Sequence, residues 1–365
     1  MKLLVLDQFS ELGGAQHVLL DLLPAIRERG WEARIGIPGD GELFGRVRLE
    51  GFPAERIHCG PYGSGRKSAA DVARFMAGTP KLARQITTMA DGVDLVYING
   101  PRLLPAAALA GFAAPAVFHA HSHLGDGLLQ RIAGAAVRRM RARVIGNCEF
   151  TALPWRRYSP EVRVIYNGVR GHVASPSTGD AVVCIGRIAP EKGQLEFLEA
   201  AAAILGQAPG TRFVIYGAPL FSGDRYEHEV RGRAKGMPVE FAGWSRDVGA
   251  ALDGAAILLA PSTAVEATTR VILEAYAAGV PVIAFANGGI PEVVEHGRTG
   301  FLARSAPEMA EYAVELLRDP GLRARISAAT RDYWARRFTL EQHRREVLAV
   351  LEGAATRAGL ASRSG

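Results

Sequence analysis

Ten short apolar runs recur along this 365-residue chain, and most of them are separated by segments with helical apolar spacing. Short apolar runs that alternate with helical segments are typical of an α/β fold whose strands form parallel sheets. No internal repeat of fixed period accompanies the alternation. The expected strands lie near residues 3–6, 33–37, 94–98, 115–119, 143–146, 162–165, 181–186, 212–216, 256–260 and 281–285.

One segment interrupts the alternation and marks the expected domain boundary. Residues 167–180 collect glycine, proline and serine without apolar periodicity, as linkers do. A chain of 365 residues, 48% of them hydrophobic, is long enough for two domains with their own cores. We therefore expect one domain over residues 1–170, a second over 171–338, and a carboxy-terminal helix with a frayed tail over 339–365 that could pack back on the first domain.

Two glutamates, Glu266 and Glu274, stand eight positions apart where an apolar strand gives way to a helix. We expect Glu266 just ahead of the helix and Glu274 about two turns inside it. Unbonded N–H groups at the helix start would favour an anion between the two carboxylates, so the pair could grip two parts of one ligand. The alternative is two surface glutamates with no shared ligand, because the spacing alone is a weak signal.

Arg187 and Lys192 flank an expected strand-to-helix turn, the place where a doubly wound sheet presents ligands. Two cations beside a helix start suit a diphosphate, because arginine binds phosphate oxygens in a bidentate fork and lysine adds a mobile charge. A second glycine-rich turn, residues 287–292, would let a ligand approach the backbone. Either turn could instead be an exposed loop without a ligand.

The amino-terminal half offers a glycine pair and three histidines. Gly13 and Gly14 stand between the first expected strand and helix, but the G-x-G-x-x-G dinucleotide fingerprint is absent. A turn eased by glycine is the alternative to a ligand contact there. His119, His121 and His123 alternate at the end of a strand and so share one face. They could bind a metal ion, fill core or loop positions, or act at a reacting centre.

Positive charge is concentrated in the amino-terminal half. Residues 1–170 carry 22 Lys and Arg against 15 Asp and Glu, a net charge of +7, whereas the rest of the chain carries −1. Several arginines cluster around one expected helix with apolar residues between them: Arg131, Arg138, Arg139, Arg141, Arg143, Arg156 and Arg157. Such a segment could dock on an anionic membrane surface or be a solvated helix face. Nucleic acid is not expected as a partner, since no recognised binding motif accompanies the arginines.

The cysteines and the length of the apolar runs bear on location. Cys59, Cys148 and Cys184 form no C-x-x-C pair, which predicts buried thiols in a reducing compartment. The first apolar run is a short strand followed by Asp7, so we expect no secretory signal peptide. No uninterrupted run approaches the ~18 apolar residues of a membrane span. We expect a cytoplasmic protein, with peripheral attachment to the inner face of the membrane left open.

Taken in order, several motifs resemble one known family, the family 4 glycosyltransferases. These are retaining enzymes with the GT-B fold, in which two Rossmann-like domains with parallel sheets face each other across a cleft. The donor half of the family is similar to GR-x4-KG at 186–193, VIYG at 214–217, FAGW at 241–244, PS-x3-E-x7-EA at 261–275 and GVPVIAFANGGIPEVV at 279–294. The resemblance extends into the amino-terminal half through GGAQHVLLDLL at 13–23, HAH at 119–121, VIGNCE at 144–149 and VIYNGV at 164–169.

The resemblance implies a role for each candidate residue of the second half. In the family, the residues matching Arg187 and Lys192 hold the nucleotide diphosphate. The glutamate matching Glu274 binds the ribose hydroxyls, and the one matching Glu266 contacts the donor sugar. Carboxylates are acceptors suited to vicinal hydroxyls, so the chemistry agrees with these roles. Three further residues complete the expected donor-binding set: Trp244, Thr269 and Arg270.

This chain departs from the family between the two glutamates. Residues 267–270 read Ala-Thr-Thr-Arg where the family often has glycine-phenylalanine-glycine, so the family's donor-sugar preferences do not carry over. Arg270 could add a third cation there. In the amino-terminal half, the family places the loop matching Gly13 and Gly14 under the donor phosphates and one histidine beside the donor sugar. For that histidine we prefer His121, which is next to the loop, over His119.

The resemblance predicts an enzyme without a cofactor. We also expect it to be independent of metal ions, because Arg187, Lys192 and the helix start before Arg270 could stabilise the diphosphate and the sequence shows no obvious carboxylate metal cluster. The enzyme would move a sugar from a UDP-, GDP- or other nucleoside-diphosphate sugar to a hydroxyl acceptor, lipid-linked or soluble, in glycan, glycolipid or cell-envelope biosynthesis. The departing diphosphate would be stabilised electrostatically. The expected catalytic residues are His121, Glu266, Arg187 and Lys192. Two rival hypotheses are another GT-B enzyme, such as a nucleotide-sugar epimerase, and a non-catalytic nucleotide-sugar sensor.

Overall fold

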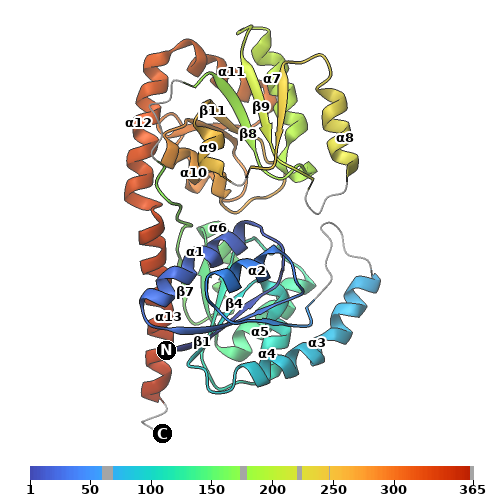
Figure 1. The fold of residues 1–365 in the computed structure, drawn as a ribbon, viewed down its shortest axis with the longest axis vertical. Helices are drawn as coiled ribbons and strands as arrows, with labels where there is room; N and C mark the ends of the chain where they lie inside the picture. The colour runs from blue at the N-terminus through green and yellow to red at the C-terminus, as the bar shows by residue number, and fades with distance from the viewer. Residues whose placement is uncertain (60–68, 173–178, 220–223, 246, 362–365) are drawn as a thin grey trace. The chain divides into compact units, whose positions relative to one another are not determined.

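The computed structural model describes residues 1–59, 69–172, 179–219, 224–245 and 247–361 (Figure 1). It divides into two compact units, Met1–Tyr166 with Glu341–Gly365, and Asn167–Leu340. The first unit contains a seven-stranded sheet and the second a six-stranded sheet, and all the strand pairs described are parallel. The prediction of an α/β fold with two parallel sheets is therefore confirmed.

The sheet of the first unit has the strand order β3-β2-β1-β4-β5-β6-β7. Its strands are β1 (Lys2–Asp7), β2 (Glu32–Ile37), β3 (Ala54–Arg56), β4 (Leu95–Asn99), β5 (Ala116–Ala120), β6 (Arg143–Gly146) and β7 (Val162–Val164). The chain builds outward from β1 to β3 and then returns to build outward in the other direction from β4. The order thus reverses between β1 and β4, and doubly wound sheets open a crevice at the carboxyl ends of the strands at such a switch point.

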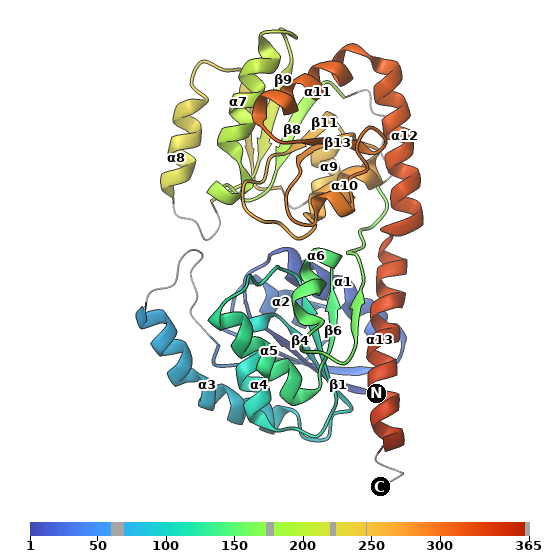
Figure 2. The ribbon, with the colours of Figure 1, turned by 180° about the vertical axis from the view of Figure 1, so that it is seen from behind.

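Helices cover both faces of this sheet because successive residues of a strand point to opposite faces. They are α1 (Gly14–Glu28), α2 (Glu42–Leu49), α3 (Ala69–Met89), η1 (Pro101–Leu103), α4 (Leu104–Ala110), α5 (Leu128–Met140), α6 (Glu149–Ala152) and η2 (Leu153–Trp155). Leu4 and Leu6 of β1 join a core with α3, α4 and α5 on one face (Figure 2). Leu3 and Val5 join a second core with α1 and α2 on the other.

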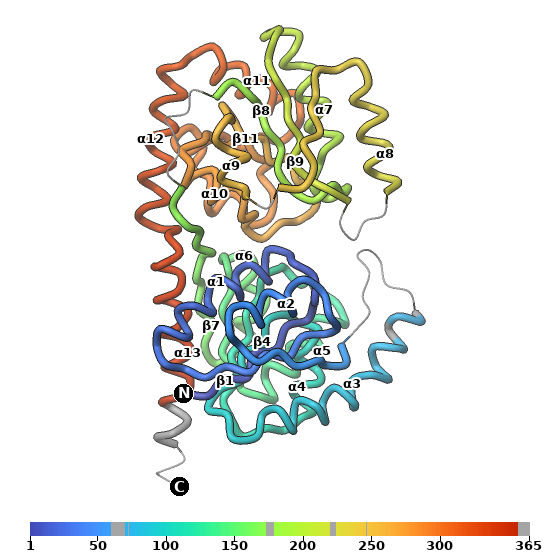
Figure 3. Tube along the Cα trace, in the orientation of Figure 1, coloured from blue at the N-terminus to red at the C-terminus, as the bar shows by residue number. Residues whose placement is uncertain are grey.

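The last helix, α13 (Leu340–Ala361), belongs to the first unit from Glu341 onward. Val347, Leu348 and Leu351 are buried in the same core as Leu3 of β1. Figure 3 shows this end of the trace running beside the start of the chain. The first unit is therefore completed by a segment distant in sequence.

The sheet of the second unit has the strand order β10-β9-β8-β11-β12-β13. Its strands are β8 (Ala181–Ile185), β9 (Arg212–Tyr216), β10 (Val239–Gly243), β11 (Ala255–Ala260), β12 (Val282–Phe285) and β13 (Gly300–Ala303). Its helices are η3 (Pro190–Lys192), α7 (Gln194–Leu205), α8 (Asp224–Arg233), α9 (Val248–Leu252), α10 (Arg270–Ala278), η4 (Ile290–Glu292), α11 (Ala306–Arg318) and α12 (Pro320–Arg337). Here the strand order reverses between β8 and β11, which places a second switch point at the carboxyl ends of these two strands.

The ends of the second unit differ by a few residues from the expected range of 171–338. Residues 167–170 belong to it because Val169 forms a parallel bridge with Thr339. The Val169 N–H donates to the Phe338 carbonyl at 3.0 Å, and the Trp334 indole donates to the Val169 carbonyl at 3.3 Å. These contacts fasten the start of the second unit to its last residues.

Candidate functional site

The expected donor-site residues of the second unit gather at its switch point. Arg187 and Lys192 follow β8, and Glu266 follows the neighbouring strand β11. Because parallel strands end at the same edge of a sheet, these loops leave the sheet side by side. The sequence order alone separates Lys192 from Glu266 by 74 positions, and the reversal of strand order joins them.

A glycine lets the β8 and β11 loops approach each other. Gly193 has φ +73°, and a Cβ at this position would lie 1.8 Å from the Pro261 carbonyl oxygen. Two hydrogen bonds fasten the same contact: the Thr263 N–H donates to the Glu191 carbonyl at 3.1 Å, and its hydroxyl donates to the Pro190 carbonyl at 2.9 Å. The close approach of the two backbones therefore requires a glycine at position 193, the last residue of the GR-x4-KG stretch.

The glycine-rich turn after β12 supports the backbone of Glu266. A Cβ on Gly288, whose φ is +56°, would lie 1.9 Å from the Glu266 carbonyl oxygen. The Gly289 N–H donates to that same oxygen at 3.0 Å, and the Asn287 side-chain amide donates to the Ala264 carbonyl at 2.5 Å. The turn for which the sequence predicts a ligand contact therefore also holds the Glu266 loop in place.

Cations and carboxylates alternate in this site. The Lys192 ammonium lies 2.5 Å from the Glu266 carboxylate, and the two side chains are 24% and 19% exposed. The Arg187 guanidinium pairs with Glu191, four positions further along the chain. Both residues that are expected to bind the diphosphate, Arg187 and Lys192, therefore have a carboxylate neighbour. A diphosphate bound at these two side chains would have to share or replace their carboxylate partners.

The start of α10 differs from the expectation. The helix begins at Arg270, so Glu274 is its fifth residue and lies just over one turn inside, where we had expected about two turns. Thr269 is the N-cap, with extended backbone and no capping hydrogen bond from its side chain. Arg270 and Glu274 share one helix face at i and i+4, and the guanidinium lies 2.9 Å from the carboxylate.

Thr268 is a residue of this site that the sequence analysis did not single out. It is 6% exposed, and its hydroxyl has no hydrogen-bond partner among the described residues. A buried hydroxyl without a partner is rare in folded proteins and is a candidate to bind a ligand group. Trp244, by contrast, follows the edge strand β10 and is 47% exposed, with β9 between its strand and β8.

The switch point of the first unit holds the glycine pair. Gly13 is the N-cap of α1 and has φ −138°, so its backbone is extended and open to any residue type. A Cβ on Gly14 would meet nothing within 4 Å. The start of a helix leaves its first N–H groups without partners inside the helix, which suits an anionic ligand group.

The three histidines have distinct surroundings. His119 lies within β5, is fully buried, and its Nδ1 lies 2.6 Å from the Tyr97 hydroxyl. His121 follows β5, and its Nε2 lies 2.6 Å from Oδ1 of Asn99. The His123 Nδ1 lies 3.1 Å from the Phe150 carbonyl. Burial lowers the pKa of His121 to about 3 and lowers the pKa of His119 as well, so both rings are neutral near neutral pH.

Asp7 and Asn99 also belong to this switch point, although the sequence analysis had not singled them out as functional. Asp7 ends β1 and Asn99 ends β4, and the two are opposite each other in the parallel pair. Both are fully buried. Burial raises the pKa of the Asp7 carboxyl to about 6, and hydrogen bonds from Asn99, Phe9 and Gln16 oppose this rise. The sequence does carry a sign of both residues, since Asp7 and Asn99 each stand directly after a short apolar run.

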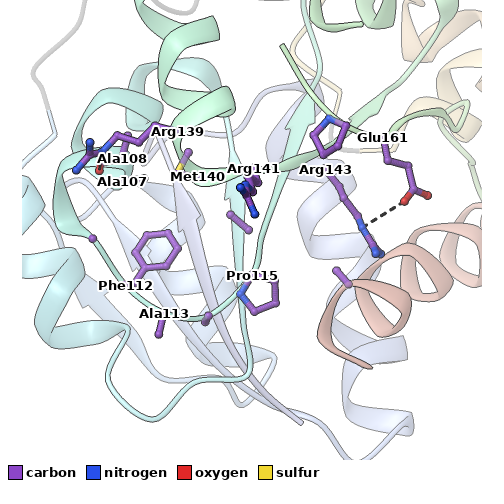
Figure 4. Close-up of a pocket in the computed structure, with 15 residues that line it drawn as sticks. Ala107, Ala108, Phe112, Ala113, Pro115, Arg139, Met140, Arg141, Arg143 and Glu161 are labelled. Atoms are coloured by element: carbon purple, nitrogen blue, oxygen red, sulfur yellow. Dashed lines mark hydrogen bonds and ion pairs between the residues drawn. The ribbon is translucent and has the colours of Figure 1, made fainter. Parts of the chain in front are cut away.

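The expected basic segment of the first unit is only partly available to a partner. Arg139 donates to the Ala108 carbonyl at 3.0 Å, and Arg143, the first residue of β6, lies 3.3 Å from Glu161. Arg131, Arg138, Arg139 and Arg141 are all exposed, although Arg138 also donates to the Arg157 carbonyl at 3.3 Å. A cavity of about 830 Å³ lies between the loop that precedes β5 and the loop that precedes β6, and Figure 4 shows Arg139, Arg141 and Arg143 around it with Phe112 and Pro115.

Other properties of the described chain bear on the expected chemistry. Cys59, Cys148 and Cys184 are buried and take part in no disulfide among the described residues. Within the described ranges, no three His, Cys, Asp or Glu side chains group closely enough to hold a metal ion. In the described part of the chain, no helix is both long enough and apolar enough to cross a bilayer.

Two family models match successive parts of the chain. The model described as Glycosyltransferase Family 4 matches residues 12–170, and the model described as Glycosyl transferases group 1 matches residues 179–319. Among curated proteins, the Phosphatidyl-myo-inositol mannosyltransferase of Mycobacterium leprae is 27% identical over 376 residues, 95% of each chain. A GDP-mannose-dependent monoacylated alpha-(1-6)-phosphatidylinositol monomannoside mannosyltransferase of Corynebacterium glutamicum is 30% identical over 220 residues, and this match spans 56% of each chain.

Solved structures agree with these matches. The Anabaena protein HepE in complex with UDP-glucose has a TM-score of 0.83 to this chain at 26% identity, covering 97% of this chain and 100% of that one. The sucrose-phosphate synthase of Thermosynechococcus elongatus has a TM-score of 0.74 at 19% identity, which supports the fold alone. The chain therefore belongs to glycosyltransferase family 4 and has the GT-B fold.

Proposed function

We propose that this chain transfers a sugar, with retention of anomeric configuration, from a nucleoside diphosphate sugar to a hydroxyl acceptor. The observation that supports this most is the set of two cations and two carboxylates at the switch point of the second unit: Arg187, Lys192, Glu266 and Glu274. Cations suit the diphosphate and carboxylates suit sugar hydroxyls. The named relatives are transferases, which favours transfer over an epimerase or a sensor.

In this proposal, Arg187, Lys192 and the first turn of α10 bind the diphosphate and stabilise the charge that develops as it leaves. Electrostatic stabilisation by groups already in place is generally the largest contribution to such a step. Lys192 already contacts Glu266, so one ammonium can bridge the diphosphate and the carboxylate that binds the donor sugar. Glu274 binds the ribose hydroxyls once Arg270 shares or releases it. These roles need no metal ion.

The first unit supplies the acceptor side in this proposal. The loop at Gly13 and Gly14 leads into the first turn of α1, whose N–H groups can bind an anion, and His121, which follows β5 of the same sheet, offers a neutral ring. The relatives named for phosphatidylinositol substrates favour a lipid-linked acceptor, and a soluble saccharide is the alternative. The base of the donor nucleotide could be guanine or uracil, because one named relative is GDP-mannose-dependent and the HepE structures contain UDP.

The experiment that tests the function begins with a thermal-shift panel of nucleoside diphosphates and then their sugars, because a ligand that binds the folded state raises its stability. The preferred nucleotide sugar is then incubated with lipid-linked and soluble acceptors, with and without EDTA. Transfer with retained configuration that survives EDTA is the expected result. If the protein binds the donor but shows neither sugar transfer nor slow hydrolysis of the donor, the enzyme assignment is wrong. Loss of transfer in EDTA, restored by magnesium or manganese, would overturn metal independence alone.

A further inference from the structure

A chain of buried polar groups crosses three neighbouring strands of the first unit. Asp7 ends β1, Asn99 ends β4, and His121 follows β5, which is the next strand in the sheet. The Asn99 side-chain nitrogen lies 2.5 Å from Oδ2 of Asp7, and the Asn99 side-chain oxygen lies 2.6 Å from Nε2 of His121. Asp7 and Asn99 are fully buried. The three side chains therefore form one continuous hydrogen-bonded path.

The chemistry of Asp7 dictates the direction of every bond in this path. Above its pKa of about 6, Asp7 is ionised and both of its oxygens can only accept, and Oδ1 already accepts from the Phe9 N–H at 2.9 Å and the Gln16 side-chain amide at 2.8 Å. The Asn99 amide must therefore direct its nitrogen to Asp7 and its oxygen to His121. That oxygen can only accept, so the hydrogen of the neutral His121 ring is on Nε2.

The opposite ring nitrogen is left as an acceptor. Nδ1 of His121 is buried and has no hydrogen-bond partner among the described residues. Since the low pKa of His121, about 3, keeps the ring neutral, Nδ1 carries a lone pair near neutral pH. A buried acceptor without a partner is costly, and a hydroxyl from a ligand would satisfy it.

We propose that Asp7 and Asn99 are positioning residues that fix His121 in the Nε2–H tautomer, so that Nδ1 is presented to a hydroxyl group of a substrate sugar. The role toward a sugar rests on the proposed function, whereas the tautomer is a property of the protein alone. A hydrogen-bonded path of this kind fixes the ring orientation as well as the position of its proton.

The alternative is that the path only satisfies buried polar groups. In that case its loss would lower stability without changing the tautomer of His121. The two readings differ in what they predict for the Asp7→Asn variant. An asparagine at position 7 can still accept from Phe9 and Gln16, but it presents an amide nitrogen to Asn99. The Asn99 amide must then turn over, its nitrogen faces His121, and the ring hydrogen moves to Nδ1.

The test is nitrogen NMR of histidine-labelled protein without substrate, with the His121→Gln variant used to assign the His121 ring signals. We expect an Nε2–H ring in the wild type and an Nδ1–H ring in Asp7→Asn. In transfer assays, Asp7→Asn should lower kcat at least about tenfold, the effect of losing roughly one hydrogen bond, and change the KM for the donor much less. The matched control is Tyr97→Phe, which removes one buried hydrogen bond to the neighbouring His119 and should leave the His121 tautomer unchanged.

Each outcome decides the proposal. An Nδ1–H ring in the wild type, or the same tautomer in wild type and Asp7→Asn, would overturn it, and so would an unchanged kcat in a variant whose tautomer has switched. If Asp7→Asn does not fold, Asn99→Ala replaces it, and the expected result is a ring that populates both tautomers. A wild-type Nε2–H ring in a protein without transfer activity would overturn the proposed function and leave the tautomer assignment standing.

Discussion

Charge pairing within the candidate donor site sets what single residues can contribute to binding. Arg187 pairs with Glu191 and Lys192 with Glu266, so the site is close to neutral in spite of its cations. A diphosphate gains from these cations only as far as it replaces or shares the carboxylates. The energetic effect of each residue is therefore best measured with ligands that differ only in their phosphates.

Replacing Arg187 or Lys192 with alanine should weaken nucleoside diphosphate binding far more than binding of the free nucleoside. Each lost charge-assisted contact should cost about 1.5–3 kcal/mol. Calorimetry with both ligands measures the difference. Arg212→Ala is the matched control, because Arg212 is an exposed arginine of the same unit that pairs with Asp180. Equal weakening of both ligands would contradict the assignment.

The two glutamates should have separable effects because they contact different cations. Glu274→Gln should mainly weaken nucleotide binding, since the ribose hydroxyls lose a charged acceptor. Glu266→Gln should lower transfer while nucleoside diphosphate affinity is kept or increased, because Lys192 loses its carboxylate partner. Binding constants and single-turnover rates measure both. If the two variants behave alike, or if neither changes activity, the division of roles is wrong.

The pKa of Asp7 makes the stability of the first unit depend on pH. Burial raises this pKa from 3.8 to about 6, so the folded state binds the proton more tightly than the unfolded state. The contribution of Asp7 to the free energy of unfolding is then full below pH 3.8 and is lost as pH rises through about 6. A difference of roughly two pKa units corresponds to about 3 kcal/mol.

Urea unfolding of wild type and Asp7→Asn across this pH range measures the effect. The free energy of unfolding of the wild type relative to the variant should fall as pH rises, because only the wild type titrates at this position. A difference between the two proteins that stays constant with pH would show that burial does not shift this carboxyl.

At the scale of elements, the sequence predicts the central strands well and the edge strands poorly. Each of the ten expected runs overlaps a strand, whereas β3, β10 and β13 were not expected. All three are edge strands, and only β7 among the four edge strands overlaps an expected run, the one at 162–165. Residues 241–243, which belong to the FAGW motif, are the end of β10, where half-buried and exposed positions alternate. β3 and β10 have no fully buried position, so they lack the continuous apolar run that marks a central strand. β13 is buried, but it has only four residues and begins with a glycine.

The residues of the candidate sites likewise fall into those that the sequence predicts and those that it does not. Arg187, Lys192 and Glu266 could be found from the sequence because each stands in a short motif at the end of an expected strand. Asp7 and Asn99 could not be paired, because they are 92 positions apart and meet only through the order of strands in the sheet. The pairing of Arg270 with Glu274 depends on where α10 begins, and helix ends are the part of an element that a sequence defines least.

The contact between the β8 and β11 loops predicts a strong effect at one glycine. Gly193→Ala should lower the free energy of unfolding, by about 1–3 kcal/mol for the left-handed backbone alone, and should weaken diphosphate binding because the Lys192 loop must move. Gly206→Ala is the control, since Gly206 has φ −62° and its Cβ would lie 3.5 Å from the nearest carbonyl oxygen. A Gly193→Ala protein with wild-type stability would contradict the close approach.

At the scale of the whole molecule, each unit holds its candidate residues at the same topological place. The second unit has Lys192 and Glu266 between β8 and β11, and the first has Asp7 and Asn99 between β1 and β4. Ligand sites of doubly wound sheets open at such switch points, so the two halves of the proposed reaction follow from one folding pattern used twice. Charge distinguishes the halves, with +7 over residues 1–170 and −1 over the rest.

That difference in charge leads to a prediction about membranes. If the first unit docks on an anionic bilayer to reach a lipid-linked acceptor, each basic residue near the surface adds about 1 kcal/mol. The exposed Arg131 and Arg141 are the residues to replace, because Arg139 and Arg143 are held by contacts within the unit. The double variant with glutamine at both positions should lose cosedimentation with anionic vesicles and keep nucleotide binding.

The control removes the same charge from the second unit through Arg225→Gln with Arg233→Gln, both exposed positions of α8. It should sediment with vesicles as the wild type does, because local charge near the bilayer, and not the net charge of the protein, provides the attraction. Binding of the wild type should weaken as salt is added, since the Debye length is only ~8 Å at physiological ionic strength. A wild-type protein that ignores anionic vesicles at low salt would refute docking and shift the expected acceptor to a soluble saccharide.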